Sequence, residues 1–307
     1  MHADAMASSM PNFDSEGDAF PAPSRQGDRH EHELDGLLGS ASRHDFGVVA
    51  INVGTSCADA GRLAAVWSAA RRQLPVLRVA FVAEVDLHGE GPPQLDFDEF
   101  SLFRHYPGRG SRSMAFCVCR TLVPHVTCQW TGRAGVCEVV GLSQRGARDL
   151  CVIGWHGAHQ EAFWDSLADL RTVCRSARGC QTVVVGDFNV DYSPTLALPE
   201  PELPFPLPPR DDEFADERAA VDAVVAANGL SVHVPSVIAD SPGGPWGLYC
   251  TQWPVTRIAS GGQATRQRPS LLDLVAADSS LGDATISWCS APADHAMIFF
   301  AAGARPT

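Results

Sequence analysis

Polar side chains follow several apolar runs of this 307-residue sequence at the point where each run ends. In VVVGDFNVD (183–191), Asp187 and Asn189 emerge two residues apart, so in extended geometry both side chains lie on one face. A carboxylate and a carboxamide placed in this way can orient a water molecule and hold a phosphoryl oxygen. Asp-x-Asn also forms turns, so the motif alone is only moderately specific.

Other apolar runs end in residues of the same chemical kinds. Taken singly, each of these residues is more typical of a strand-end cap or a loop. Taken together, the acids, amides and imidazoles are the groups that a hard cation and acid–base catalysis require. They are Asn52 after VVAI, Glu84 after VAFVA, His156 after CVIGW, Asp273 within SLLDLVA, and the pair Asp294–His295 before AMIFF.

Apolar periodicity predicts the elements that must position these residues. A purely parallel sheet is disfavoured, because a series of strands without intervening helices occupies the middle of the sequence. We therefore expect an α/β (α+β) fold in which two mixed β-sheets pack face to face as a sandwich, with helices on the outside. The predicted strands are 47–54, 76–85, 113–119, 124–130, 135–142, 148–155 and 181–188, and the predicted helices are 58–74, 158–178 and 212–228.

Two segments are expected to lie outside regular structure. Residues 1–44 are acidic and lack periodicity, which predicts a disordered tail ahead of one domain at 45–303. Residues 194–209 contain seven prolines, which predicts a surface loop.

Composition narrows the function classes. All 23 basic residues are arginine, so a P-loop lysine, a pyridoxal Schiff base and a Ser–Lys dyad are excluded. No apolar run approaches the roughly 18 residues that a membrane span needs, so we expect no membrane partner. The ten cysteines include no CxxC pair, and the sequence starts without a secretory signal. We therefore expect an intracellular protein, nuclear or cytoplasmic, with its cysteines reduced.

The formal charge of −13 argues mildly against a nucleic-acid partner, but local charge decides where a phosphate binds. Residues 101–150 hold seven arginines against two acids, including Arg109 and Arg112 in HYPGRGSRSMAFCV. These arginines are equally consistent with solvated loop positions. Trp246, Tyr249 and Trp253 could likewise stack on bases or fill the core.

The order Asn52, Glu84, His156, GDFN (186–189), Asp273 and a closing Asp294–His295 resembles the endonuclease/exonuclease/phosphatase superfamily. DNase I-like nucleases, apurinic-site endonucleases and the endonuclease domains of LINE-type retroelements belong to it. The resemblance covers about 46–301 and implies the DNase I-like four-layer fold.

The resemblance also implies a metal site and a phosphate contact. Glu84 would ligate Mg²⁺, for which Mn²⁺ can substitute, with Asn52 and Asp294 close to the same ion. His156 would contact the phosphate, and His159, three residues later, is a competing candidate.

The remaining motif residues take acid–base roles in the same resemblance. Asp187 would orient or deprotonate the attacking water, and Asn189 would support the phosphate. His295 would face the scissile phosphate, with Asp273 fixing its tautomer.

The implied activity is hydrolysis of phosphodiester bonds in nucleic acid, with DNA expected as the substrate rather than RNA. The protein is expected to be a monomer. Arg109 and Arg112 are the expected substrate-binding residues, because their segment resembles retroelement endonuclease domains more than lipid phosphatases. Two alternatives stay open: a phosphatase of small-molecule or lipid phosphoesters, and an inactive binding module of the same fold.

Overall fold

A computed structural model describes ten segments of the chain. They are residues 46–54, 60–85, 94–107, 112–140, 150–196, 212–237, 246–258, 269–279, 281–288 and 295–302. The predicted tail at 1–44, most of the proline-rich segment, and the site candidates Arg109 and Asp294 lie outside the described residues.

One mixed sheet has eight strands. β1 runs parallel to β2 and antiparallel to β14, so the centre of the sheet combines both pairings. The order is β11 (Ser236–Val237), β13 (Gly282–Ser287), β14 (Met297–Ala302), β1 (Phe46–Asn52), β2 (Leu77–Val85), β5 (Ser113–Cys119), β4 (Phe100–His105) and β3 (Gln94–Asp96).

The second sheet has six strands and is also mixed. β8 and β9 are parallel, whereas the other neighbouring strands are antiparallel. The order is β10 (Ser231–His233), β12 (Asp273–Ala277), β9 (Gln181–Asp187), β8 (Leu150–Trp155), β7 (Ala134–Val139) and β6 (Val126–Thr131).

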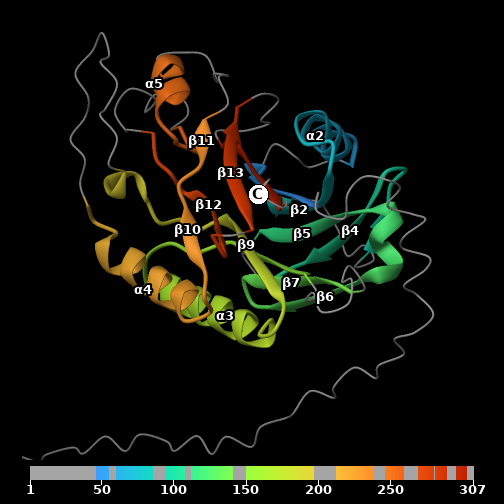
Figure 1. The fold of residues 1–307 in the computed structure, drawn as a ribbon, viewed down its shortest axis with the longest axis horizontal. Coiled ribbons are helices and arrows are strands. Elements are labelled where there is room, and N and C mark those ends of the chain that lie inside the picture. The colour runs from blue at the N-terminus through green and yellow to red at the C-terminus, as the bar shows by residue number, and fades with distance from the viewer. Residues whose placement is uncertain are drawn as a thin grey trace, which may run out of the picture.

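The two sheets pack face to face, and helices cover their outer faces (Figure 1). Side chains from both sheets, such as Phe81 and Val185, share one buried core. α2 (Ala60–Gln73) packs Leu63 and Trp67 on the outer face of the eight-stranded sheet. α3 (Phe163–Ser176) and α4 (Ala215–Ala226) cover the six-stranded sheet, with Leu167 of α3 in that core. The predicted sandwich with outer helices is confirmed.

The short helices explain where predicted boundaries shift. η2 (Arg120–His125) occupies the start of the predicted strand 124–130, because Pro124 lacks the N–H that a strand would use. η3 (Gln160–Ala162) occupies the first turn of the predicted helix 158–178, and α3 begins only at Phe163. η4 (Ser193–Thr195) and α5 (Gly247–Gln252) complete the described helices, none of which is long and apolar enough to cross a membrane.

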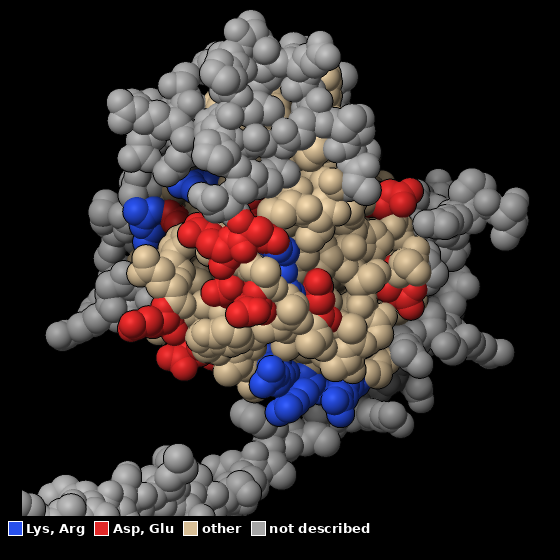
Figure 2. All heavy atoms as spheres, turned by 90° about the vertical axis from the view of Figure 1, so that its left-hand side faces the viewer, with Lys and Arg blue, Asp and Glu red and all other residues tan. Residues whose placement is uncertain are grey.

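Figure 2 shows a group of acidic side chains in the middle of one side of the molecule and a group of basic side chains along the lower edge of that side. Exposed Asp216 and Asp222 lie on α4, whereas α3 exposes Arg171 and Arg175. These acids sit on the outer helix layer. They contribute to the net charge of −13 without lying among the strand ends that carry the candidate site.

Candidate active site

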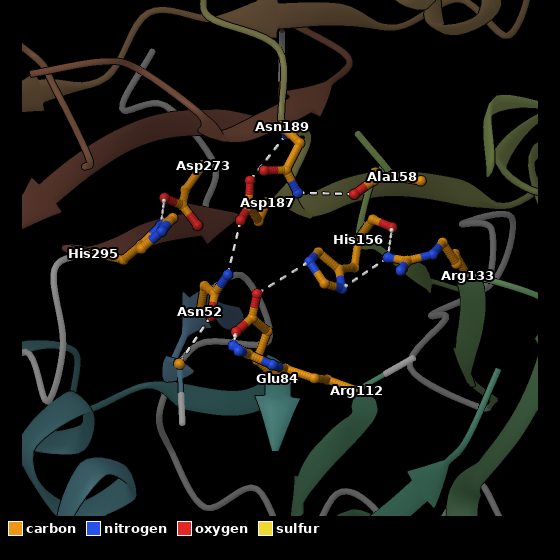
Figure 3. A network of polar contacts seen from close by, with 12 residues as sticks. Asn52, Glu84, Arg112, Arg133, His156, Ala158, Asp187, Asn189, Asp273 and His295 are labelled. Carbon is orange, nitrogen blue, oxygen red and sulfur yellow. Dashed lines mark hydrogen bonds and ion pairs between the residues drawn. The ribbon is translucent and has the colours of Figure 1, made fainter. Parts of the chain in front are cut away.

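Strand ends from both sheets meet at one edge of the sandwich (Figure 3). The parallel strands β1 and β2 end at Asn52 and near Glu84, and the parallel strands β8 and β9 end next to His156 and at Asp187. β12 runs antiparallel to β9 and begins at Asp273, which is the register partner of Asp187. The fold therefore brings residues that are far apart in the sequence to a single edge.

Asp187 is the most fully bonded carboxylate of this edge. Asn52 Nδ2 donates to its Oδ2 over 2.8 Å, and the backbone N–H of Asn189 donates to its Oδ1 over 2.9 Å. Burial alone would raise the pKa of Asp187, but His295, His156 and these two hydrogen bonds together outweigh burial and hold the pKa below its ordinary value. Asp187 is therefore a carboxylate at neutral pH.

Asp273 and His295 form a buried pair beside Asp187. His295 Nδ1 lies 2.7 Å from Asp273 Oδ2, and Asp273 Oδ1 has no hydrogen-bond partner among the described residues. Burial raises the pKa of Asp273 to about 6. An oxygen of this kind, buried and unpaired beside a second carboxylate, is suited to a cation.

His156 faces Glu84 on one side and Arg133 on the other. Arg133 NH1 lies 3.2 Å from His156 Nδ1, and because arginine only donates, Nδ1 accepts and Nε2 carries the proton. Nε2 lies 3.7 Å from Glu84 Oε1, and Arg112 forms an ion pair with Glu84 Oε2. Burial lowers the pKa of His156 to about 4, so the ring is neutral at neutral pH.

A β-bulge aims Glu84 into this edge. The β2–β5 register passes from Ala83 to Val85 without pairing Glu84, and Glu84 has a φ of +60°. Bulges of this kind turn a side chain away from its strand alternation and are common next to active sites. The sequence pattern placed Glu84 at a strand end, but the local backbone directs its side chain.

The donor set fits a divalent cation that prefers oxygen. One ligand atom each from Asp187, Asp273 and His295 lies within 4.8 Å of the others, and all three residues are buried. Glu84 adds a third carboxylate across the same edge (Figure 3). Carboxylate-rich sites suit Mg²⁺ and Mn²⁺ rather than metals that prefer sulfur.

The predicted site residues that the structure describes come together with one exception. Arg112 and the seven motif residues in the described segments lie at this edge. His159, the alternative to His156, is instead exposed just before η3. The alternative left open for the aromatic residues is also decided: Trp246, Tyr249 and Trp253, in and beside α5, are buried in a hydrophobic core, so they cannot stack on a base.

Arg133 is a site residue that sequence patterns did not indicate. It lies in the turn between β6 and β7, and its guanidinium also donates to the backbone oxygen of His156 over 3.3 Å. Arg133 is one of seven arginines in residues 101–150, and nothing in its neighbouring sequence distinguishes it from the other six. Only the pairing of Ala134 with Trp155 brings its neighbour Arg133 to His156.

Solved structures share this fold at low sequence identity. The endonuclease domain of TRAS1, a telomere-specific non-LTR retrotransposon, is 14% identical, with a TM-score of 0.53 over 85% of this chain and 100% of that domain. The AP endonuclease LMAP from Leishmania major is 14% identical, with a TM-score of 0.59 over 94% of this chain and 93% of that one. The 3′ phosphatase NExo from Neisseria, bound to a product DNA hairpin, is 15% identical, with a TM-score of 0.50 over 83% and 98%.

No family model and no curated protein matches the sequence. The structural similarity shows that the fold is that of endonuclease/exonuclease/phosphatase proteins, as the sequence resemblance predicts.

Proposed function

We propose that the protein is a Mg²⁺-dependent endonuclease that hydrolyses phosphodiester bonds of DNA. The observation that carries this proposal is the meeting of an ionised Asp187, a buried Asp273–His295 pair and Glu84 at one edge of the sandwich. Carboxylates for a hard cation and groups for proton transfer are the two requirements of metal-assisted hydrolysis.

Glu84 and Asn52 would hold the cation, with Asp294 as a further ligand expected from the sequence resemblance. Asp187 and Asp273 lie close enough to contribute oxygen atoms. When bound, Mg²⁺ neutralises the negative charge that develops on the phosphoryl oxygens. Mn²⁺ shares the preference for oxygen ligands and is expected to substitute.

Protein side chains supply the remaining steps. Asp187, held by Asn52 and the backbone of Asn189, would orient the attacking water and accept its proton. His295, oriented by Asp273, would face the scissile phosphate. The side-chain N–H of Asn189 donates to the oxygen of Gly157 over 2.8 Å, so Asn189 positions the loop beside the phosphate in addition to its expected contact.

DNA is favoured as the substrate by the arginines at the site and by the structures that share the fold. Arg112 and Arg133 both lie beside the Glu84–His156 contact, where a phosphate backbone would pass, and Arg109 remains an expected contact. The fold neighbours include a retrotransposon endonuclease, an AP endonuclease and a phosphatase with DNA product. A retroelement origin agrees with the first of these and is part of the proposal.

The test is nicking of supercoiled plasmid by the full chain with Mg²⁺, with Mn²⁺ and with EDTA. Asp187→Asn keeps the shape of the side chain and removes its charge, so nicking should fall by roughly 10²–10⁴-fold. Asp222→Asn is the matched control, because Asp222 is an exposed acid on α4 that bonds Tyr192. It should nick like the wild type.

The substrate classes are separated by running duplex DNA, RNA and bis(p-nitrophenyl) phosphate in parallel. Hydrolysis of the small diester without cleavage of either nucleic acid would contradict the DNA proposal and favour the small-molecule alternative. Nicking that persists unchanged in Asp187→Asn would contradict the assigned site.

A further inference from the structure

A second group of metal-ligating side chains lies at the end of the six-stranded sheet opposite the candidate active site. Glu138 is the penultimate residue of β7, Cys151 is the second residue of β8, and Cys180 directly precedes β9. The active-site residues lie at the other ends of β8 and β9. The full length of the two parallel strands therefore separates this cluster from His156 and Asp187.

Strand register places the three side chains on one face. Glu138 pairs directly with Cys151, so both side chains point to the same side of the sheet. Cys151 pairs with Thr182, and Cys180 lies two residues before Thr182, on the same side. Cys151 is buried in the core beneath α3, while Glu138 and Cys180 are partly exposed.

The ligand atoms of Glu138, Cys151 and Cys180 all lie within 4.8 Å of one another. In a tetrahedral zinc site with Zn–S bonds of about 2.3 Å, the two sulfur atoms lie about 3.8 Å apart, so only small side-chain rotations are needed. The two soft thiolates select Zn²⁺ over Mg²⁺, because Mg²⁺ prefers oxygen ligands.

The surroundings leave Glu138 and Cys180 available for a metal. Neither forms an ion pair or a hydrogen bond with another described side chain. Because both are partly exposed, an ion can enter from solvent and keep a water molecule as its fourth ligand. The described cysteines form no disulfide, so the two thiols are in the form that binds metal after loss of their protons.

We propose that Glu138, Cys151 and Cys180 form a Zn²⁺ site, separate from the Mg²⁺ site of the proposed endonuclease. The ion would join the ends of β7, β8 and β9. It would lie at the end of the sheet away from the reacting groups, so the proposed hydrolysis does not require it.

The test is Co²⁺ titration of the full chain, stripped of metal and reduced with a phosphine. Thiolate-bound Co²⁺ absorbs in the near ultraviolet by sulfur-to-metal charge transfer, whereas Co²⁺ in the carboxylate site lacks this band. We expect one equivalent with the band, unaffected by excess Mg²⁺ and removed by Zn²⁺. Cys180→Ser should abolish the band, and Glu138→Gln should weaken Co²⁺ binding by more than about tenfold.

Cys174→Ser is the matched control, because Cys174 lies in the same core on α3 but outside the cluster. It should keep both the band and the affinity. Cys180 is only partly buried, so its substitution tests the site without depending on a core change, and circular dichroism verifies folding. The proposal is overturned if the reduced wild type shows no thiolate band, or if Cys180→Ser keeps it. Plasmid nicking is measured on Cys180→Ser as well. A variant that loses the thiolate band but still nicks shows that the Zn²⁺ site and the proposed endonuclease activity are tested independently.

Discussion

Two residues of the candidate active site, Glu84 and Asn189, have left-handed backbone conformations, with φ of +60° and +52°. Such angles are uncommon for residues other than glycine and often occur at functional sites. At Asn189 the conformation is supported by its N–H bond to Asp187 and its side-chain bond to Gly157. Both left-handed residues therefore lie where the chain presents side chains of the candidate site, whereas Gln160, which also has a positive φ, begins η3.

Substitution of Asn189 separates backbone strain from the lost side chain. Asn189→Ala and Asn189→Gly both remove the bond to Gly157, but only glycine adopts a positive φ without cost. The free energy of unfolding of Asn189→Ala should be lower than that of Asn189→Gly by about 1 kcal/mol. Urea denaturation of both variants without metal measures this, and equal stabilities would show that the left-handed conformation is not required.

At the scale of elements, Thr256 connects the segments that carry the Asp273–His295 pair. Its buried hydroxyl oxygen accepts hydrogen bonds from the backbone N–H groups of Leu272 and Asp273, over 3.0 and 2.9 Å. Its backbone oxygen accepts a bond from Ala296 N over 2.6 Å. Thr256 thus holds the start of β12 against the residue that follows His295.

Removal of the Thr256 hydroxyl should destabilise the protein and disturb the pair. Thr256→Val keeps the shape but leaves two buried N–H groups without an acceptor, at a cost of roughly 1–3 kcal/mol for each. Thr256→Ser keeps the acceptor and should lose much less stability. Thermal unfolding measures the stability of the two variants. At a temperature where both are folded, Thr256→Val should nick plasmid more slowly than the wild type, and Thr256→Ser should nick at close to the wild-type rate. Equal loss in the two variants would contradict the hydroxyl's role.

The sequence pattern indicated Asp273 but not Thr256, the residue that holds the start of β12 in place. Asp273 interrupts an apolar run, which is a local signal, whereas Thr256 lies in a segment without clear periodicity. β4 was missed in the same way. Its sequence FSLFRH follows an acidic, proline-containing segment and lacks strict alternation, and its strand form depends on pairing with β3 and β5.

At the scale of the whole molecule, His105 connects the two sheets near the active-site edge. It ends β4 of the eight-stranded sheet, and its Nε2 lies 2.9 Å from the oxygen of Gly132 in the turn between β6 and β7. Its ring stacks on Trp130 with centroids 5.0 Å apart. Because the carbonyl oxygen only accepts, Nε2 carries a proton.

The His105 contact predicts a pH-dependent stability. Burial lowers the pKa of His105 below its unfolded value of about 6.5, although Gly132 and Asp169 oppose this. Between the folded and unfolded pKa, the unfolded chain binds more protons, so this contribution is present above pH 6.5 and is lost as the pH falls through the folded pKa.

His105→Gln keeps an N–H donor but does not titrate. Urea denaturation of this variant from pH 7.5 to 5 should therefore show a smaller loss of unfolding free energy than the wild type. Other titrating groups, His156 among them, are shared by both proteins and cancel in the comparison. Parallel curves for the two proteins would contradict the assignment.

The sequence by itself determined the kinds of residue at the strand ends and the alternation of strands and helices, because both are carried by neighbouring residues. Tertiary structure alone decided which residues meet. Asn52 and Asp187 bond across 135 positions, and Arg133 reaches His156 only through strand pairing. Trp246, Tyr249 and Trp253 read equally well as base-stacking or core residues, and their burial depends on helices and strands from elsewhere in the chain. Long-range packing has no local signature, so only the folded chain settles it.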